Sequence, residues 1–129
     1  MLQEEITLCG KQVTLAYCYG TEISYKLLAD EECTDFIRAV INGITEKKMP
    51  DSRKAIYLIM AAMTAFYESQ NQENPIEDKQ LIFHATPDYI GLAIGVIVGL
   101  YLKFYKIPVE EPEDKQEKVN RNGRKQKNA

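Results

Sequence analysis

The side chains that could perform chemistry in this 129-residue chain are few and scattered. The three cysteines Cys9, Cys18 and Cys33 are odd in number and lack the C-x-x-C spacing of a zinc site. Their pattern also does not suit a disulfide framework, because one thiol would be left over. We therefore expect no metal site, and free thiols of the kind that persist in a reducing cytoplasm.

General acid–base chemistry needs a histidine or a convergent pair of carboxylates. His84 is the one histidine, it has no cysteine near it in sequence, and a partly buried or capping role is the favoured interpretation. Glu31-Glu32 and Glu110-Glu111 are adjacent pairs, and adjacent side chains point apart on a helix. A phosphate-binding loop of the G-x-x-x-x-G-K-[ST] type is absent from the sequence. We expect no catalytic residues, no cofactor and no enzymatic activity.

The charge balance also argues against a nucleic-acid partner. The chain has 16 basic and 19 acidic residues, for a net charge of −3. A dedicated nucleic-acid-binding domain is usually strongly basic. The N-terminal residues 1–5 include two glutamates and no apolar stretch, which is untypical of a signal peptide.

Residues 5–19 have the alternating pattern of a β-hairpin, with Gly10 at the turn supplying a positive φ. An isolated two-stranded hairpin is marginally stable in water, so its apolar face must pack on the segments that follow. The residues on that face are Ile6, Leu8, Val13, Leu15, Tyr17 and Tyr19.

Helical spacing of apolar residues predicts five helices after the hairpin. Their expected ranges are 22–29, 32–46, 52–70, 76–85 and 87–106. Thr21, Asp51 or Ser52, and Thr86 are the expected N-caps. The first helix is expected to bury Ile23, Leu27 and Leu28. The second is expected to bury Phe36, Ile37, Val40, Ile41 and Ile44. In the third, Ala62, Ala65 and Ser69 form a small-residue face on which another helix could lie closely.

The predicted fold class is α+β, mainly α: an N-terminal β-hairpin packed on a small bundle of four to five helices. This fold is expected to form a single globular domain over residues 1–108. The remaining segment, 109–129, has three residues of the apolar set, Val109, Val119 and Ala129. Burying so few apolar residues cannot offset the conformational entropy lost on ordering the segment. We therefore expect a disordered charged tail.

The helix expected at 87–106 has glycines at every fourth position, Gly91, Gly95 and Gly99. Each interior glycine costs about 1 kcal/mol relative to alanine, which indicates a face that another backbone approaches closely. Such an approach predicts that Gly95→Leu destabilises the fold. Whether this face lies in the core or at an interface stays open. The helix ends in Tyr101 and Phe104, which either pack on the hairpin or form the rim of an apolar patch for a partner.

The order and size of these elements resemble the tail assembly chaperones of long-tailed bacteriophages and prophages. The resemblance covers residues 1 to about 107 and rests on these segments: Ile6-x-Leu8-x-Gly10-Lys11-x-Val13-x-Leu15, Thr21-Glu22-Ile23-x-Tyr25-Lys26-Leu27, Tyr57-Leu58, Ala61-Ala62, Pro75-Ile76, Thr86-Pro87-Asp88-Tyr89-Ile90 and Leu100-Tyr101. It implies a non-enzymatic protein of the bacterial host cytoplasm. Its partners would be the tape measure protein, whose apolar helical stretches it would keep soluble, and tail tube subunits.

Under this resemblance, the partner-binding hypothesis concerns Gly91, Gly95, Gly99, Tyr101 and Phe104. Self-association stays open, and neither nucleic acid nor membrane is an expected partner. One alternative is a small membrane-associated protein that uses the third and last helices as a hairpin. Another is an adaptor or regulatory protein unrelated to phages.

Overall fold

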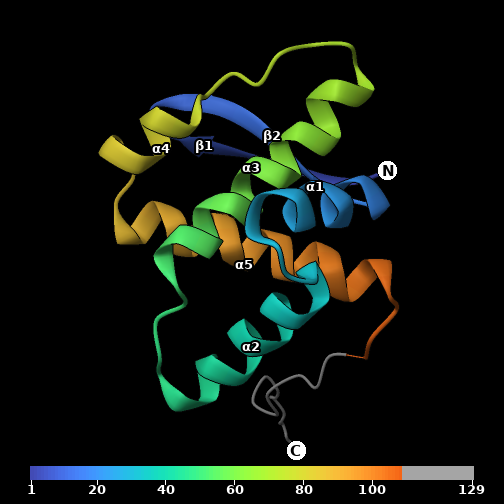
Figure 1. The fold of residues 1–129 in the computed structure, drawn as a ribbon, viewed down its shortest axis with the longest axis vertical. Helices are drawn as coiled ribbons and strands as arrows, with labels where there is room; N and C mark the ends of the chain where they lie inside the picture. Colours follow the sequence, from blue (N-terminus) through green and yellow to red (C-terminus); the bar gives the residue numbers. More distant parts are fainter. Residues whose placement is uncertain (109–129) are drawn as a thin grey trace, which may run out of the picture.

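The computed structural model describes residues 1–108, and the segment predicted to be a disordered tail lies outside them. The fold is α+β and mainly α, with an N-terminal hairpin followed by five helices (Figure 1). The elements are β1 (Leu2–Leu8), β2 (Lys11–Tyr17), α1 (Tyr19–Ala29), α2 (Cys33–Glu46), α3 (Ser52–Ser69), α4 (Asp78–His84) and α5 (Pro87–Phe104).

The hairpin turns through two residues that both have positive φ, Cys9 at 52° and Gly10 at 78°. This is the pattern of a type I′ turn, whose twist matches that of the two strands. The antiparallel register pairs Leu8 with Lys11, Ile6 with Val13 and Glu4 with Leu15. The predicted apolar face is buried from Ile6 onward through Tyr17.

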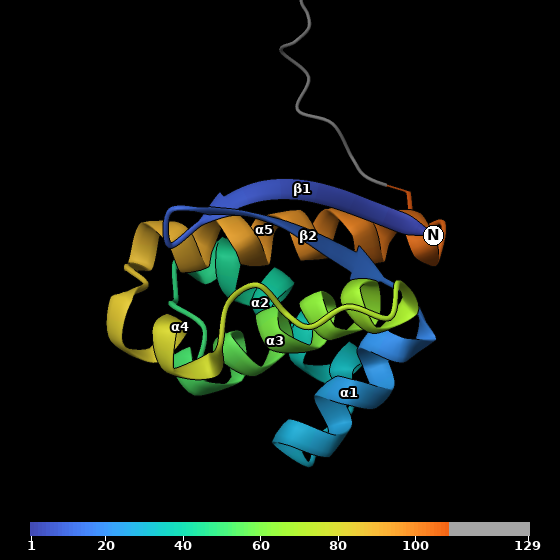
Figure 2. The same ribbon diagram turned by 90° about the horizontal axis from the view of Figure 1, so that it is seen from above.

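The buried face of the hairpin packs on two long helices. In Figure 2, β1 lies along α5, and β2 runs beside both α5 and α3. Helix α3 is the centre of the molecule, because it contacts β2, α1, α4 and α5. Its fully buried residues are Ala55, Leu58, Ile59, Ala61, Ala62 and Met63. Part of the predicted small-residue face is used here: a side-chain carbon on Gly20 of α1 would lie 3.9 Å from Cβ of Ala65, whereas Ser69 is exposed.

Helix α1 differs from the prediction in its start. It begins at Tyr19, which was expected in the strand, and its N-cap is Cys18. Thr21 is therefore inside the helix, where its hydroxyl donates to the carbonyl of Ala16 at 2.8 Å.

The face that α1 buries also differs. Ile23, Leu27 and Leu28 were expected to point inward and are exposed, Leu27 by 82%. The buried residues are Thr21 and Tyr25, because Tyr25 stacks on Phe36 with ring centroids 5.6 Å apart. The expected inward face of α1 is therefore wrong.

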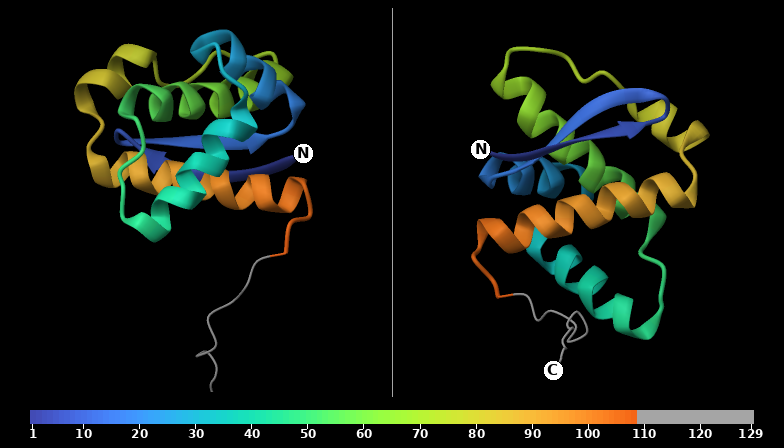
Figure 3. Two further views of the ribbon diagram at one scale, coloured as in Figure 1. Left: turned by 60° about the horizontal axis from the view of Figure 1, so that its bottom comes forward. Right: turned by 180° about the vertical axis from the view of Figure 1, so that it is seen from behind.

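Helix α2 buries the first part of its predicted apolar face and leaves the end free. Phe36 and Ile37 are buried, Val40 and Ile41 are half-buried, and Ile44 is 66% exposed. Figures 1 and 3 show the reason, since α2 projects away from the hairpin and its C-terminal end extends past the core. The prediction that Ile44 faces the core is wrong.

The predicted starts of the two long helices are confirmed. The carboxylate of Asp51 accepts a hydrogen bond from the amide of Lys54 at 3.1 Å, and the hydroxyl of Thr86 accepts one from the amide of Tyr89 at 3.4 Å. Pro87 occupies the first turn of α5, where its missing N–H costs nothing. Helix α5 ends beside the N-terminus of the chain (Figure 2).

Candidate functional site

The glycine row of α5 faces outward. Gly91 and Gly95 are exposed and Gly99 is half-buried, whereas Ala93, Ile94 and Ile97 on the other side of the helix are buried. A side-chain carbon built at any of the three glycines would meet no atom within 4 Å. We expected another element of this domain to approach the row closely. Within residues 1–108 no element does, so that expectation is wrong. The destabilisation expected from Gly95→Leu rested on the same approach and is corrected with it.

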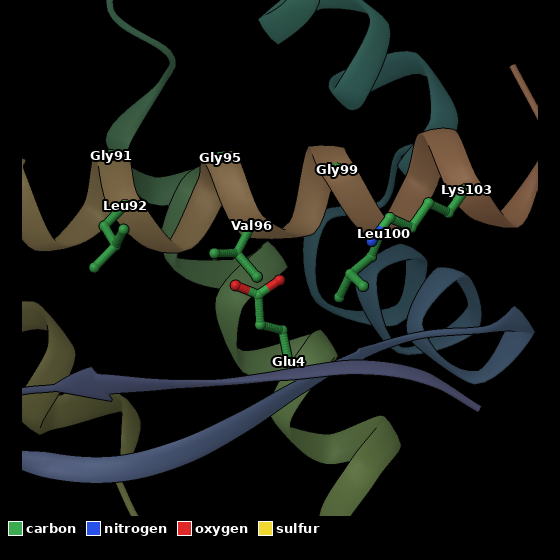
Figure 4. A pocket seen from close by; sticks show the side chains of 8 residues that line it. All are labelled: Glu4, Gly91, Leu92, Gly95, Val96, Gly99, Leu100 and Lys103. Carbon is green, nitrogen blue, oxygen red and sulfur yellow. The ribbon is translucent and has the colours of Figure 1, made fainter. Parts of the chain in front are cut away.

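A groove of about 410 Å³ runs along this open face, bounded on one side by strand β1. Its lining residues are Glu4, Gly91, Leu92, Gly95, Val96, Gly99, Leu100 and Lys103. In Figure 4 the side chain of Glu4 extends from β1 toward Val96. The groove thus has an apolar and glycine-rich floor, a carboxylate on the strand side and an ammonium group at one end.

Tyr101 and Phe104 do not form the rim of this groove. Tyr101 is 2% exposed, and its ring lies 5.7 Å from that of Tyr17 in the hairpin. Phe104 is half-buried and packs on Tyr17 and Tyr19. Two residues along an α-helix turn about 200°, so Tyr101 points away from Gly99. The partner-binding assignment of Tyr101 is corrected: it is a core residue.

The aromatic cluster is held by one carboxylate. Glu22 accepts hydrogen bonds from the hydroxyls of Tyr17, at 2.7 Å, and Tyr105, and so joins the hairpin, α1 and the end of α5. The pKa of Tyr17 is raised by burial and by its hydrogen bond to Glu22. The pKa of Tyr105 is raised by its own hydrogen bond to Glu22 and by burial. Both hydroxyls are therefore donors throughout the physiological range, and the cluster has a structural role.

A second recess, of about 480 Å³, lies where the start of α3, α4 and the start of α5 meet. Ile56, Leu81 and Ile90 line it. Phe83 and Met49 are exposed by 75% and 77%. Apolar side chains are thus presented around the start of α5.

Residues that carry chemistry are dispersed within residues 1–108. His84 is exposed at the end of α4, and the three thiols are free. Cys33 is buried, and burial raises the pKa of its thiol to about 12, so it is protonated and inert at neutral pH. In this part of the chain no group of three His, Cys, Asp or Glu side chains is placed to hold a metal.

One described helix, α5, is long and apolar enough to cross a bilayer by length and composition. A third of its residues are buried against the rest of the domain. A core helix of a water-soluble domain passes the same test.

Sequence reasoning missed Glu4, Leu92, Val96, Leu100 and Lys103 as residues of the groove. A signal for Glu4 was present, because it interrupts the run of alternate apolar residues formed by Leu2, Ile6 and Leu8. A carboxylate at an inward position is typical of an edge strand, where it limits unspecific pairing with other strands.

Comparison with protein families, with characterised proteins and with solved structures finds no match to this chain.

Proposed function

We propose that this protein is a non-enzymatic tail assembly chaperone of a long-tailed phage or prophage. In this role it binds the tape measure protein in the bacterial cytoplasm and helps to recruit tail tube subunits. The proposal combines the resemblance in element order with one structural observation, the open face of α5. That face holds three glycines at helical spacing with no neighbour within 4 Å of where their side chains would be.

An open glycine row suits a helical client. Each interior glycine sacrifices helix stability, and within residues 1–108 no packing contact compensates for that loss. Contact with a partner helix would compensate, because small residues allow two helix backbones to approach closely. The client's apolar residues at positions i, i+3, i+4 and i+7 would lie against Leu92 and Val96.

Exposed apolar side chains on other elements support the same role. Ile23 and Leu27 on α1 and Ile82 and Phe83 on α4 are each more than half exposed. Ile23 and Leu27 lie one helical turn apart and Ile82 and Phe83 are adjacent, so each of the two helices carries a small exposed apolar patch of its own. A chaperone of a long apolar helix has use for several such contacts.

The test is co-expression with the tape measure protein from the same phage or prophage genome, followed by fractionation and pull-down. We expect the client to be soluble with the chaperone and insoluble without it. Gly95→Leu fills the groove, and we expect it to weaken client capture about tenfold or more while the melting temperature holds or rises.

Ala39→Leu is the matched control, because it adds the same side chain at an exposed position of α2. It should leave capture unchanged. A client that stays insoluble with the wild-type chaperone would overturn the proposed function. Equal client capture by Gly95→Leu and Ala39→Leu would show that the client does not bind at the α5 face.

A further inference from the structure

The two outer edges of the hairpin are treated differently by the fold. In an antiparallel ladder, alternate residues direct their backbone N–H and C=O groups away from the partner strand. On β2 this outward set includes Thr14 and Ala16. The amide of Thr14 donates to the hydroxyl of Tyr67 at 3.0 Å, and the carbonyl of Ala16 accepts from the hydroxyl of Thr21 at 2.8 Å. Side chains of α3 and α1 therefore bind two of the outward backbone groups of β2.

The edge of β1 is open. The register places Gln3, Glu5 and Thr7 opposite Ala16, Thr14 and Gln12, so the backbone groups of these three β1 residues point outward. Within residues 1–108 their amides and carbonyls have no hydrogen-bond partner, and all three residues are exposed. Seven residues of regular strand with a free edge form a template for one more strand.

We infer that the β1 edge binds an extended, basic segment of a partner polypeptide by strand addition. The backbone of that segment would pair with Gln3, Glu5 and Thr7. Its basic character follows from the two carboxylates in the middle of β1: Glu5 on the outer face and Glu4 on the face toward α5. Opposite charges on neighbouring strands stabilise the pairing.

The same charges disfavour a second copy of this chain. A symmetric antiparallel pairing of two β1 strands would bring Glu4 and Glu5 against Glu4 and Glu5 of the copy, and like charges directly opposite are destabilising. The basic segment of this chain, residues 120–129, is a poor occupant by composition. It contains glycine and three asparagines and no β-branched or aromatic residue.

The added strand would also use the groove. Glu4 lines the groove together with Val96 and Leu100, so side chains of the segment on the Glu4 face would lie over this part of α5. The site is thus a strand edge beside an apolar floor. The inference goes beyond the proposed chaperone function and does not depend on it, because it concerns an extended partner segment rather than a helical client.

The probe is a short synthetic peptide in which valine and lysine alternate, added to the full-length protein. Amide hydrogen exchange by NMR measures the occupied edge directly. We expect the amides of Gln3, Glu5 and Thr7 to exchange about tenfold or more slowly with peptide. The amides of Glu4 and Ile6 already pair with β2 and should change little.

Two matched variants test the edge. Thr7→Pro removes an outward N–H of β1 and leaves the ladder bonds in place, whereas Gln12→Pro does the same at the directly opposite position of β2. We expect Thr7→Pro to weaken peptide binding about tenfold and Gln12→Pro to leave it unchanged. Charge reversal, Glu4→Lys with Glu5→Lys, should transfer the preference to a peptide in which valine alternates with glutamate.

Three outcomes would overturn the inference, and the first two need no variant. One is slow exchange of Gln3, Glu5 and Thr7 in the free protein, which would mean that the chain or a second copy already covers the edge. Another is equal binding of a helix-forming alanine–lysine peptide of the same charge. The third is equal loss of binding in folded Thr7→Pro and Gln12→Pro.

Discussion

The side chain of Thr21 joins the end of β2 to the start of α1 through two hydrogen bonds. It is fully buried, it donates to the carbonyl of Ala16 at 2.8 Å, and it accepts from the amide of Cys18 at 3.2 Å. The ladder with β1 pairs neither of these two backbone groups, and without the hydroxyl they would lack partners.

Thr21→Val keeps the shape of the side chain and removes the hydroxyl. We expect it to lower the free energy of unfolding by about 1–3 kcal/mol, because it leaves a buried donor and a buried acceptor unsatisfied. Thr21→Ser, which keeps the hydroxyl, should lose less. Urea unfolding followed by circular dichroism measures both. A loss in Thr21→Ser as large as that in Thr21→Val would mean that the methyl group contributes as much as the hydrogen bonds.

At this scale the sequence identified residue types better than their partners. Thr86, and either Asp51 or Ser52, were predicted as caps, and Thr86 and Asp51 are caps, because capping depends on a few adjacent residues. Thr21 was predicted as a cap and is instead a bridge to Ala16. For Tyr101 the sequence left two alternatives, packing on the hairpin or the rim of a patch for a partner, and the structure has it packed against Tyr17 of the hairpin.

Among the elements, α5 is the one whose sequence works against its own structure. Three glycines in an 18-residue helix weaken it, and in residues 1–108 nothing sits over them. The helix is held instead by its opposite face, where Ala93, Ile94 and Ile97 are buried.

Gly91→Ala and Gly95→Ala should therefore each stabilise the domain, by about 0.5–1 kcal/mol, through helix propensity alone. The urea midpoint of each single variant and of the double variant checks this, and the two effects should add. A loss of stability in either variant would show that another backbone approaches the row in solution.

All seven elements could be predicted in order, because the periods of the hairpin and the helices differ clearly. The face of α1 could not be predicted. Its sequence offers one stripe with Tyr19, Ile23 and Leu27 and another with Thr21 and Tyr25. The choice between them is made by Phe36 and by α3, which are distant in sequence.

In the molecule as a whole, three buried acids bind their protons more tightly when folded. Burial raises the pKa of the Cys33 thiol from 9.0 to about 12. Burial, followed by hydrogen bonds to Glu22 and Glu31, raises the pKa of Tyr17 and of Tyr25 above the ordinary 10.0. Above pH 9 the folded state thus holds protons that the unfolded state releases.

The stability from these groups is fully present below pH 9.0 and is lost as the pH rises toward 12. We expect the urea midpoint to fall steadily between about pH 9 and about pH 11. Cys33→Ala removes one of the three groups and should make this decline shallower. A midpoint that stays level in the wild type would mean that these side chains reach solvent in the folded state.

The proximity of the N-terminus to the C-terminal end of α5 has a consequence for attachment (Figure 2). Anything joined to the chain at residue 1 or at residue 108 leaves from the same pole of the domain. The opposite pole, where α4 carries Ile82 and Phe83 outward, is then unobstructed. Tethered at either end to a bead, a sensor surface or a larger assembly, the domain would present α4 to the solution.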